Sequence, residues 1–433
     1  MEVVSVAFVG YSCRMCRALA LAALLAACTG ETAKAPVVAP PIGSAAAPTV
    51  VAAATAPKTP QDVRPHHETA VTECPALVPE DADDDTKLAA LLDTANKQIV
   101  ATQFASAWTC ADRAADLVPA SVEAHHLRGS ALAALGRDAE AQLAYSLALS
   151  LDPDDPETLR AVADFYVNGK GDRGRDSLRL GLELAQRGSR RVQARRRRNP
   201  PLAADLALLE GQALNDLGRS DEALGRIDVA LRIAPGRGDA LHEKGVALFD
   251  LSRFAEAKAA FMRALAIQPD DAYSHQMLGL TLEQLGDVPG ADRALAKALE
   301  LAPADLSAPV IISTEDFQRE VQTIIDSLPA DRRAHVKAIR IEVVDFPDPA
   351  DLAAVKPPFP PTILGLYRGP VGRAHVAPMA EGETPSIVLY RKNLGRAVKT
   401  RAELTEQIRD TLLHEIGHLE GLDEDDLRRR GME

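Results

Sequence analysis

Small residues recur at a fixed spacing through the middle of the chain. Gly211, Gly245 and Gly279 each begin a tetrapeptide that ends in leucine, and they lie 34 residues apart. The same period separates two series of alanines and one series of prolines: Ala223, Ala257 and Ala291; Ala230, Ala264 and Ala298; Pro235, Pro269 and Pro303. Small residues let two helices approach closely, and proline ends a helix. The pattern predicts consecutive helical hairpins.

The period extends upstream with one irregular unit. The same pattern fits four residues upstream: Gly129, Ala141, Ala148 and Pro153. One period earlier, three residues fit it: Ala107, Ala114 and Pro119. The interval from Gly129 to Gly211 exceeds two periods by 14 residues. We place the surplus in a unit over residues 156–200, which carries a basic run: Arg190, Arg191, Arg195, Arg196, Arg197 and Arg198. A solvated helix extension is the expected role of this run, and a contact with an anion or a lipid headgroup is the alternative.

A 34-residue period with small residues at two fixed places and a closing proline resembles the tetratricopeptide repeat. The resemblance implies a helical-hairpin solenoid over residues 81–306. Its concave face would bind an extended or helical peptide or protein, which the sequence does not identify.

After Pro303 the period stops and a small α+β unit over residues 308–433 is expected. An apolar stripe predicts a helix over 313–328, and alternating apolar residues predict a half-buried strand over 339–344. Two further apolar segments, 363–367 and 387–390, follow a proline-rich loop. The strand over 387–390 is expected to lie at a sheet edge, where it could pair with an extended substrate.

The last helix carries the candidate chemistry. Thr400 and Glu403 form a capping box at its start. His414 and His418 lie one turn apart, so that their imidazoles can converge on one ion, and Glu415 can reach a metal-bound water without being a ligand. The pair falls beside the apolar stripe, which predicts a position at the edge of a cleft.

Carboxylates follow this helix. Gly421 ends it and can turn the acidic run 423–426 back toward the ion. A catalytic zinc requires three protein ligands, an open position for water and a general base. An exposed His-Glu-x-x-His that arises by chance is the alternative interpretation.

Residues 308–433 resemble a minimal zincin-like family of bacterial metallopeptidases. The most specific match is the run from His414 to Glu424, His-Glu-Ile-Gly-His-Leu-Glu-Gly-Leu-Asp-Glu. The resemblance implies zinc binding and peptidase activity, with His414, His418 and Glu424 as metal ligands and Glu415 as the catalytic base. The family usually has aspartate where Glu424 stands, so Asp423 is the alternate ligand.

The amino-terminal segment has the pattern of an export signal. Ten apolar residues, Ala18–Ala27, follow a basic flank, and they are too few to span a bilayer as a helix, which needs about 20. Leu25-Ala26-Ala27-Cys28 resembles the bacterial lipoprotein box, which implies a signal over residues 1–28 and lipidation of Cys28. An ordinary secretory signal is the alternative. Residues 29–80 are rich in alanine and proline and predict a tether.

Composition narrows the function classes. The net charge of −13 disfavours a nucleic-acid binder, and aromatic residues at 4% argue against a β-sandwich. The expected fold is mainly α, a solenoid followed by a small α+β domain. Cys74 and Cys110 are the cysteines left after signal removal and lipidation of Cys28. They form either a disulfide or two unpaired thiols.

Together these features predict a lipid-anchored zinc metallopeptidase of the bacterial cell envelope, facing the periplasm, with a protein-binding repeat array. Thr29, where an aspartate often retains lipoproteins in the inner membrane, favours the outer membrane. The alternatives are a non-catalytic scaffold with a structural metal and an envelope assembly factor. The abrupt end of the period predicts that the array and the C-terminal domain are separable.

Overall fold

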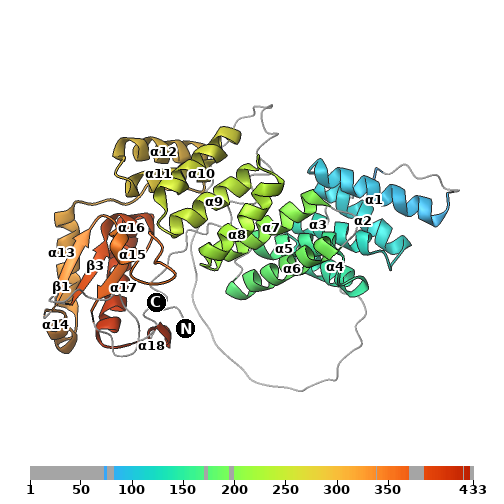
Figure 1. Ribbon diagram of the computed structural model, residues 1–433. Coiled ribbons are helices and arrows are strands. Elements are labelled where there is room, and N and C mark those ends of the chain that lie inside the picture. The colour runs from blue at the N-terminus through green and yellow to red at the C-terminus, as the bar shows by residue number, and fades with distance from the viewer. Residues whose placement is uncertain are drawn as a thin grey trace, which may run out of the picture.

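The protein combines an array of helical hairpins with a small sheet-containing domain (Figure 1). The computed structural model describes residues 73–75, 82–169, 174–194, 199–337, 339–369, 385–422 and 424–429. Cys28 and most of the tether lie outside these ranges. Within them, no helix is both long and apolar enough to cross a bilayer.

Twelve helices of the described chain pair as six consecutive hairpins. They are α1 (Asp84–Val100) with α2 (Phe104–Leu117), α3 (Val122–Ala134) with α4 (Asp138–Leu151), α5 (Pro156–Asn168) with α6 (Arg175–Ala194), α7 (Pro200–Asp216) with α8 (Ser220–Ile233), α9 (Gly238–Asp250) with α10 (Phe254–Ile267), and α11 (Ala272–Gln284) with α12 (Val288–Leu301). The mainly α solenoid expected from the 34-residue period is confirmed.

The periodic glycines are the points of closest approach within a hairpin. A Cβ at Gly211 would lie 2.4 Å from Ile227 Cγ1, and one at Gly245 would lie 2.5 Å from Phe261 Cε1. Any larger residue would push the second helix away, because packed helix pairs have no spare volume. The glycine period is therefore a packing requirement.

The surplus residues of the third hairpin lengthen its second helix. Helix α6 has 20 residues, whereas α8 has 14. Arg187 and Arg191 near its end pair with Asp154 at 2.8 and 2.5 Å. All three side chains are partly exposed, so the pairs contribute little to stability, and residues 195–198 lie outside the described ranges.

A disulfide joins Cys74 to Cys110 of α2, with an S–S distance of 2.02 Å. Near it, the Ser106 hydroxyl donates to the Glu73 carbonyl at 3.4 Å. The end of the tether is thereby fixed to the second helix of the array.

The C-terminal domain alternates short strands with helices. Its elements are α13 (Thr314–Ser327), α14 (Ala330–Lys337), β1 (Arg340–Val344), α15 (Pro349–Leu352), β2 (Gly365–Arg368), β3 (Ser386–Tyr390), α16 (Arg391–Arg396), α17 (Arg401–Leu419) and α18 (Glu424–Arg429). The predicted helix over 313–328 and the predicted strands over 339–344 and 387–390 are present, within one residue at each end, and the apolar segment 363–367 overlaps β2.

The described strands form one sheet in the order β1-β3-β2. Strand β1 pairs with β3 in parallel, with Ile341 opposite Ile387, and β2 pairs with β3 antiparallel, with Leu366 opposite Val388. The expectation that β3 lies at an edge is wrong, because it is the central strand. All five of its residues are buried, as is typical of a strand covered on both faces.

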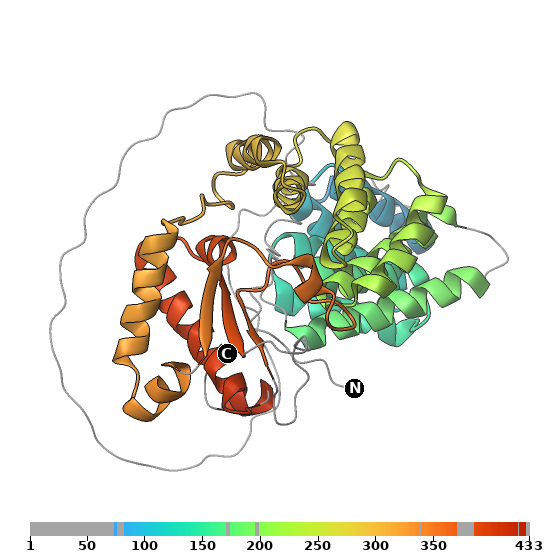
Figure 2. The same cartoon turned by 60° about the vertical axis from the view of Figure 1, so that its left-hand side comes forward.

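Alternate residues of β3 enter two different cores. Ile387 and Leu389 join a cluster with α13 and α17, whereas Val388 and Tyr390 join a second cluster that includes residues of α9, α10 and α11. Figure 2 shows the orange α15 segment against the yellow-green helices of the last repeats. An apolar core thus crosses the boundary between the two units, and their separability stays a prediction.

Candidate metal centre

Helix α17 positions the candidate ligands. Both hydrogen bonds of the predicted capping box between Thr400 and Glu403 are present. Leu404, Ile408 and Leu412 are buried along one side and fix the rotation of the helix against the sheet. The same packing fixes the direction of side chains in the last two turns.

The two histidines face one point. Their Nε2 atoms are 3.1 Å apart, and the ring planes are inclined by 83°. Two imidazoles bound to one tetrahedral zinc at 2.0–2.1 Å would have nitrogens about 3.3 Å apart. The spacing of His414 and His418 therefore fits a shared ion.

The chain turn after α17 orients one of these rings. Gly421 has φ +83, a left-handed conformation that ends the helix. The turn brings the Leu422 carbonyl to 3.1 Å from His418 Nδ1. A proton on Nδ1 that is donated to this carbonyl leaves the lone pair of Nε2 for a metal.

Glu415 lies beneath strand β2. A Cβ at Gly365 would lie 3.0 Å from Glu415 Oε1 and 2.8 Å from Thr411 Cγ2. The backbone of β2 thus lies directly against the carboxylate. Gly365 was not predicted as a site residue, although a glycine inside an apolar strand often marks a place where another chain segment approaches the backbone closely.

The site is buried more deeply than expected. His414 and Glu415 are each 2% exposed and His418 is 4% exposed. The predicted position at the edge of a cleft is therefore wrong for these side chains. The helical spacing gave the convergence of the two histidines correctly, but the cover over Glu415 includes Gly365 of β2, 50 residues earlier in the chain.

A buried tyrosine lies on the other side of the sheet. Burial raises the pKa of Tyr390, and Asp351 raises it further, whereas Arg368 lowers it. Its hydroxyl has no hydrogen-bond partner among the described residues. The phenol therefore stays protonated across the neutral range.

The third ligand is not placed. Glu424 begins α18, but its side chain lies outside the described part of the structure, as does all of Asp423. Leu427 of α18 is buried, which anchors this helix to the domain. Among the described residues, no group of three or more His, Cys, Asp or Glu side chains is arranged to hold a metal.

Family comparisons agree with this geometry. Residues 336–432 match the family described as zincin-like metallopeptidase, and residues 122–155, 178–237 and 242–305 match tetratricopeptide repeats. The chain is a tetratricopeptide-repeat array followed by a zincin-like domain. No curated protein matches this sequence.

Solved structures resemble the repeat array. Pseudomonas aeruginosa pilF is 14% identical, covers 55% of this chain and 99% of its own, and has a TM-score of 0.44. PilW, described as a widely conserved type IV pilus biogenesis factor, is 16% identical over 50% of this chain and 94% of its own, with a TM-score of 0.43. YrrB, described as having an unusual peptide-binding site, is 18% identical over 45% and 93%, with a TM-score of 0.35. These likenesses concern the helical-hairpin fold alone.

Proposed function

We propose that this chain is an exported, lipid-anchored zinc metallopeptidase with a protein-binding repeat array. The observation that carries the enzymatic part is the pair of Nε2 atoms 3.1 Å apart, with Glu415 between the two histidines in sequence. Tetratricopeptide repeats are typical of protein binding, and the zincin-like family implies a zinc site.

The Nε2 atoms of His414 and His418 would hold the ion, with Glu424 or Asp423 as third ligand. The chemistry supplied by a bound zinc would be that of a Lewis acid, which lowers the pKa of a water molecule and polarises a carbonyl group. A carboxylate oxygen of Glu415 would accept the proton of that water and donate it to the leaving amine. The backbone of β2, which lies against Glu415 and is the outer strand of the sheet among the described residues, would hold the substrate in extended form.

The proposal of export and lipid anchoring is supported by the amino-terminal sequence alone. Cys28 and the preceding Leu25-Ala26-Ala27 would direct lipidation and attachment to the periplasmic side of the envelope, with Thr29 favouring the outer membrane. Labelling with an alkyne fatty acid should mark the wild-type protein, and Cys28→Ala should abolish the label. Label that persists in Cys28→Ala would contradict lipidation at this residue.

The catalytic proposal is tested on the full chain. Wild-type protein should bind about one zinc and cleave quenched fluorescent peptides. Glu415→Gln should retain the zinc and lose cleavage by at least about a hundredfold, whereas His418→Ala should lose the zinc. A protein that binds no zinc near neutral pH would contradict the proposal.

The deep burial of the site favours one competing function, a metal that only stabilises the domain. In that case Glu415→Gln would bind zinc as poorly as His418→Ala, because Glu415 would itself be a ligand. Wild-type protein would then also cleave none of the quenched fluorescent peptides.

A further inference from the structure

The repeats and the zincin-like domain share an apolar cluster, which we call the repeat–sheet interface. The repeat array contributes side chains from α9, α10 and α11, namely Leu248, Phe249, Phe254, Ala257, Ala260, Phe261 and Leu280. The zincin-like domain contributes side chains from α15, β2, β3 and the intervening loop, namely Leu352, Phe359, Ile363, Leu366, Val388 and Tyr390. The cluster closes the face of the sheet that is turned away from α17.

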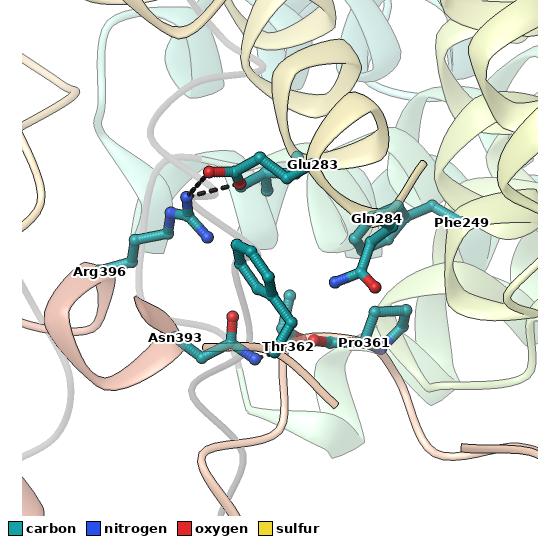
Figure 3. Close-up of a pocket in the computed structure, with 9 residues that line it drawn as sticks. Phe249, Glu283, Gln284, Pro361, Thr362, Asn393 and Arg396 are labelled. Carbon is teal, nitrogen blue, oxygen red and sulfur yellow. Dashed lines mark hydrogen bonds and ion pairs between the residues drawn. The ribbon is translucent and has the colours of Figure 1, made fainter. Parts of the chain in front are cut away.

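A buried ion pair lies at one end of this interface. Both carboxylate oxygens of Glu283 in α11 accept from Arg396 Nη2 in α16 at 2.5 Å. The side chains are 7% and 10% exposed. Figure 3 shows this pair beside Gln284, Phe249 and Asn393 in the small pocket between the two parts. A charge pair so well desolvated requires both partners, because either one alone would be left buried and uncompensated.

The loop at the interface is tied to the zincin-like domain on its other side. Asn393 Nδ2 donates to the carbonyls of Pro361 and Ile363 at 2.9 and 2.8 Å. Two residues after Ile363 the chain enters β2 at Gly365, the residue that lies against Glu415. Hydrogen bonds from Asn393 of α16 thus hold the chain just before β2, and Arg396 of the same helix forms the ion pair with the repeats.

The end of β2 is held by helix α15. Arg368 donates to both carboxylate oxygens of Asp351 in α15, at 3.0 and 2.5 Å. The next residue, Leu352, is a fully buried member of the repeat–sheet interface. Both ends of β2 are therefore connected through one or two residues to the last repeats.

We propose that the last two repeats act as a positioning element of the metal centre, which holds β2 in place over Glu415. The repeat array is then not an independent adaptor, because its final hairpins form one layer of the domain that carries the site. The proposal rests on the assignment of Glu415 to the metal centre under the proposed function, but its test does not require any activity.

The test reverses the charges of the ion pair in the full chain. Glu283→Arg and Arg396→Glu should each speed hydrogen exchange of the amides in β2 and β3 by at least about tenfold and weaken zinc affinity measured by chelator competition. The double variant Glu283→Arg, Arg396→Glu should restore much of the protection from hydrogen exchange and much of the zinc affinity. The ion pair is formed again in this variant, with its charges exchanged. Glu283→Gln, a milder change, should show the same direction if a reversed variant fails to fold.

A matched control separates this coupling from general destabilisation of the repeats. Glu210, also buried, pairs with Arg226 at 2.7 Å inside the fourth hairpin. Glu210→Arg should speed exchange in α7 and α8 and leave β2, β3 and the zinc affinity unchanged. If Glu283→Arg alters exchange only in the repeats, the proposal is wrong even if the protein hydrolyses peptides. If coupling is seen without hydrolysis, the positioning proposal stands and the catalytic one fails.

Discussion

At the scale of single residues, the candidate metal centre is built from side chains whose directions are fixed by packing and hydrogen bonds of the protein itself. Packing of α17 sets His414, and the Leu422 carbonyl sets the ring of His418. Ligands held in place by such contacts lose little conformational freedom on binding. Under the proposed function the remaining ligand would come from the segment after the helix, where the sequence offers two neighbouring carboxylates, Asp423 and Glu424.

Glu424→Ala should therefore weaken zinc binding more than Asp423→Ala. Loss of one of three ligands is expected to reduce affinity by about a hundredfold or more, whereas loss of a neighbouring charge should cost about tenfold or less. Chelator competition on the two variants measures the difference. The reverse order would assign Asp423 as the ligand.

Gly365→Ala should separate metal binding from catalysis. The added Cβ would approach Thr411 Cγ2 and Glu415 Oε1 to 2.8 and 3.0 Å, so the carboxylate must move. Zinc content should stay near one equivalent, while kcat should fall by at least about tenfold, since a shift of this size at a catalytic group is costly.

Thr411→Ser is the matched second change, because it removes the methyl group nearest to the new Cβ. Gly365→Ala with Thr411→Ser should regain part of the lost thermal stability. An unchanged kcat in Gly365→Ala would show that the contact between β2 and Glu415 has no role in the reaction.

At the scale of elements, the helical hairpins are specified by residues close together in sequence, whereas the strand order of the sheet depends on residues far apart. The glycine period and the capping box both lie within short stretches of sequence, and the structure contains them as predicted. The order β1-β3-β2 depends instead on pairings between Leu366 and Val388 and between Ile341 and Ile387. The continuous apolar run Ile387-Val388-Leu389-Tyr390 was a sign of a central strand, because strands buried on both faces lack alternation.

Gly211→Ala and Gly225→Ala should change stability in opposite directions. The first places a Cβ 2.4 Å from Ile227 and should destabilise the array by about 1–3 kcal/mol. The second lies on an exposed turn of α8 where the described chain has no atom within 4 Å, and alanine there should stabilise by about 0.5–1 kcal/mol. Urea unfolding followed by circular dichroism measures both, and equal effects would contradict the close approach at Gly211.

At the scale of the whole molecule, the least predictable property was the union of the two parts. Leu280 and Val388 are more than 100 residues apart, and each fits an ordinary local pattern. Neither pattern predicts that these two residues belong to one apolar cluster, because that contact depends on how the folded repeats pack against the folded C-terminal domain. The burial of His414 and Glu415 could not be predicted for the same reason, whereas the one-turn spacing that brings His414 and His418 together was evident in the sequence.

The stability of the molecule should also depend on one carboxyl group in the array. Burial raises the pKa of Asp250 to about 7, and Asp216 and Glu243 raise it while a hydrogen bond from Ser220 lowers it. Because the folded state holds this proton more tightly than the unfolded chain, stability should fall as pH rises from about 4 to about 7.

Asp250→Asn should remove the loss of stability that ionisation of the buried Asp250 carboxyl group causes. The variant should be more stable than wild type at pH 8, by on the order of 3 kcal/mol, with a difference that shrinks toward pH 4. Urea midpoints at both pH values measure this. The exposed Asp292→Asn is the control, and a difference between Asp250→Asn and wild type that does not vary with pH would contradict the prediction.

The disulfide between Cys74 and Cys110 also determines how tension would enter the protein. If Cys28 is anchored in a membrane, a pull on the folded part travels along the tether to Cys74 and then crosses the disulfide into α2. Residues 75–109, including all of α1, lie outside this load path. Helix α1 would remain packed under a force that reaches the rest of the array, whereas reduction of the disulfide would make α1 the first helix to be pulled away.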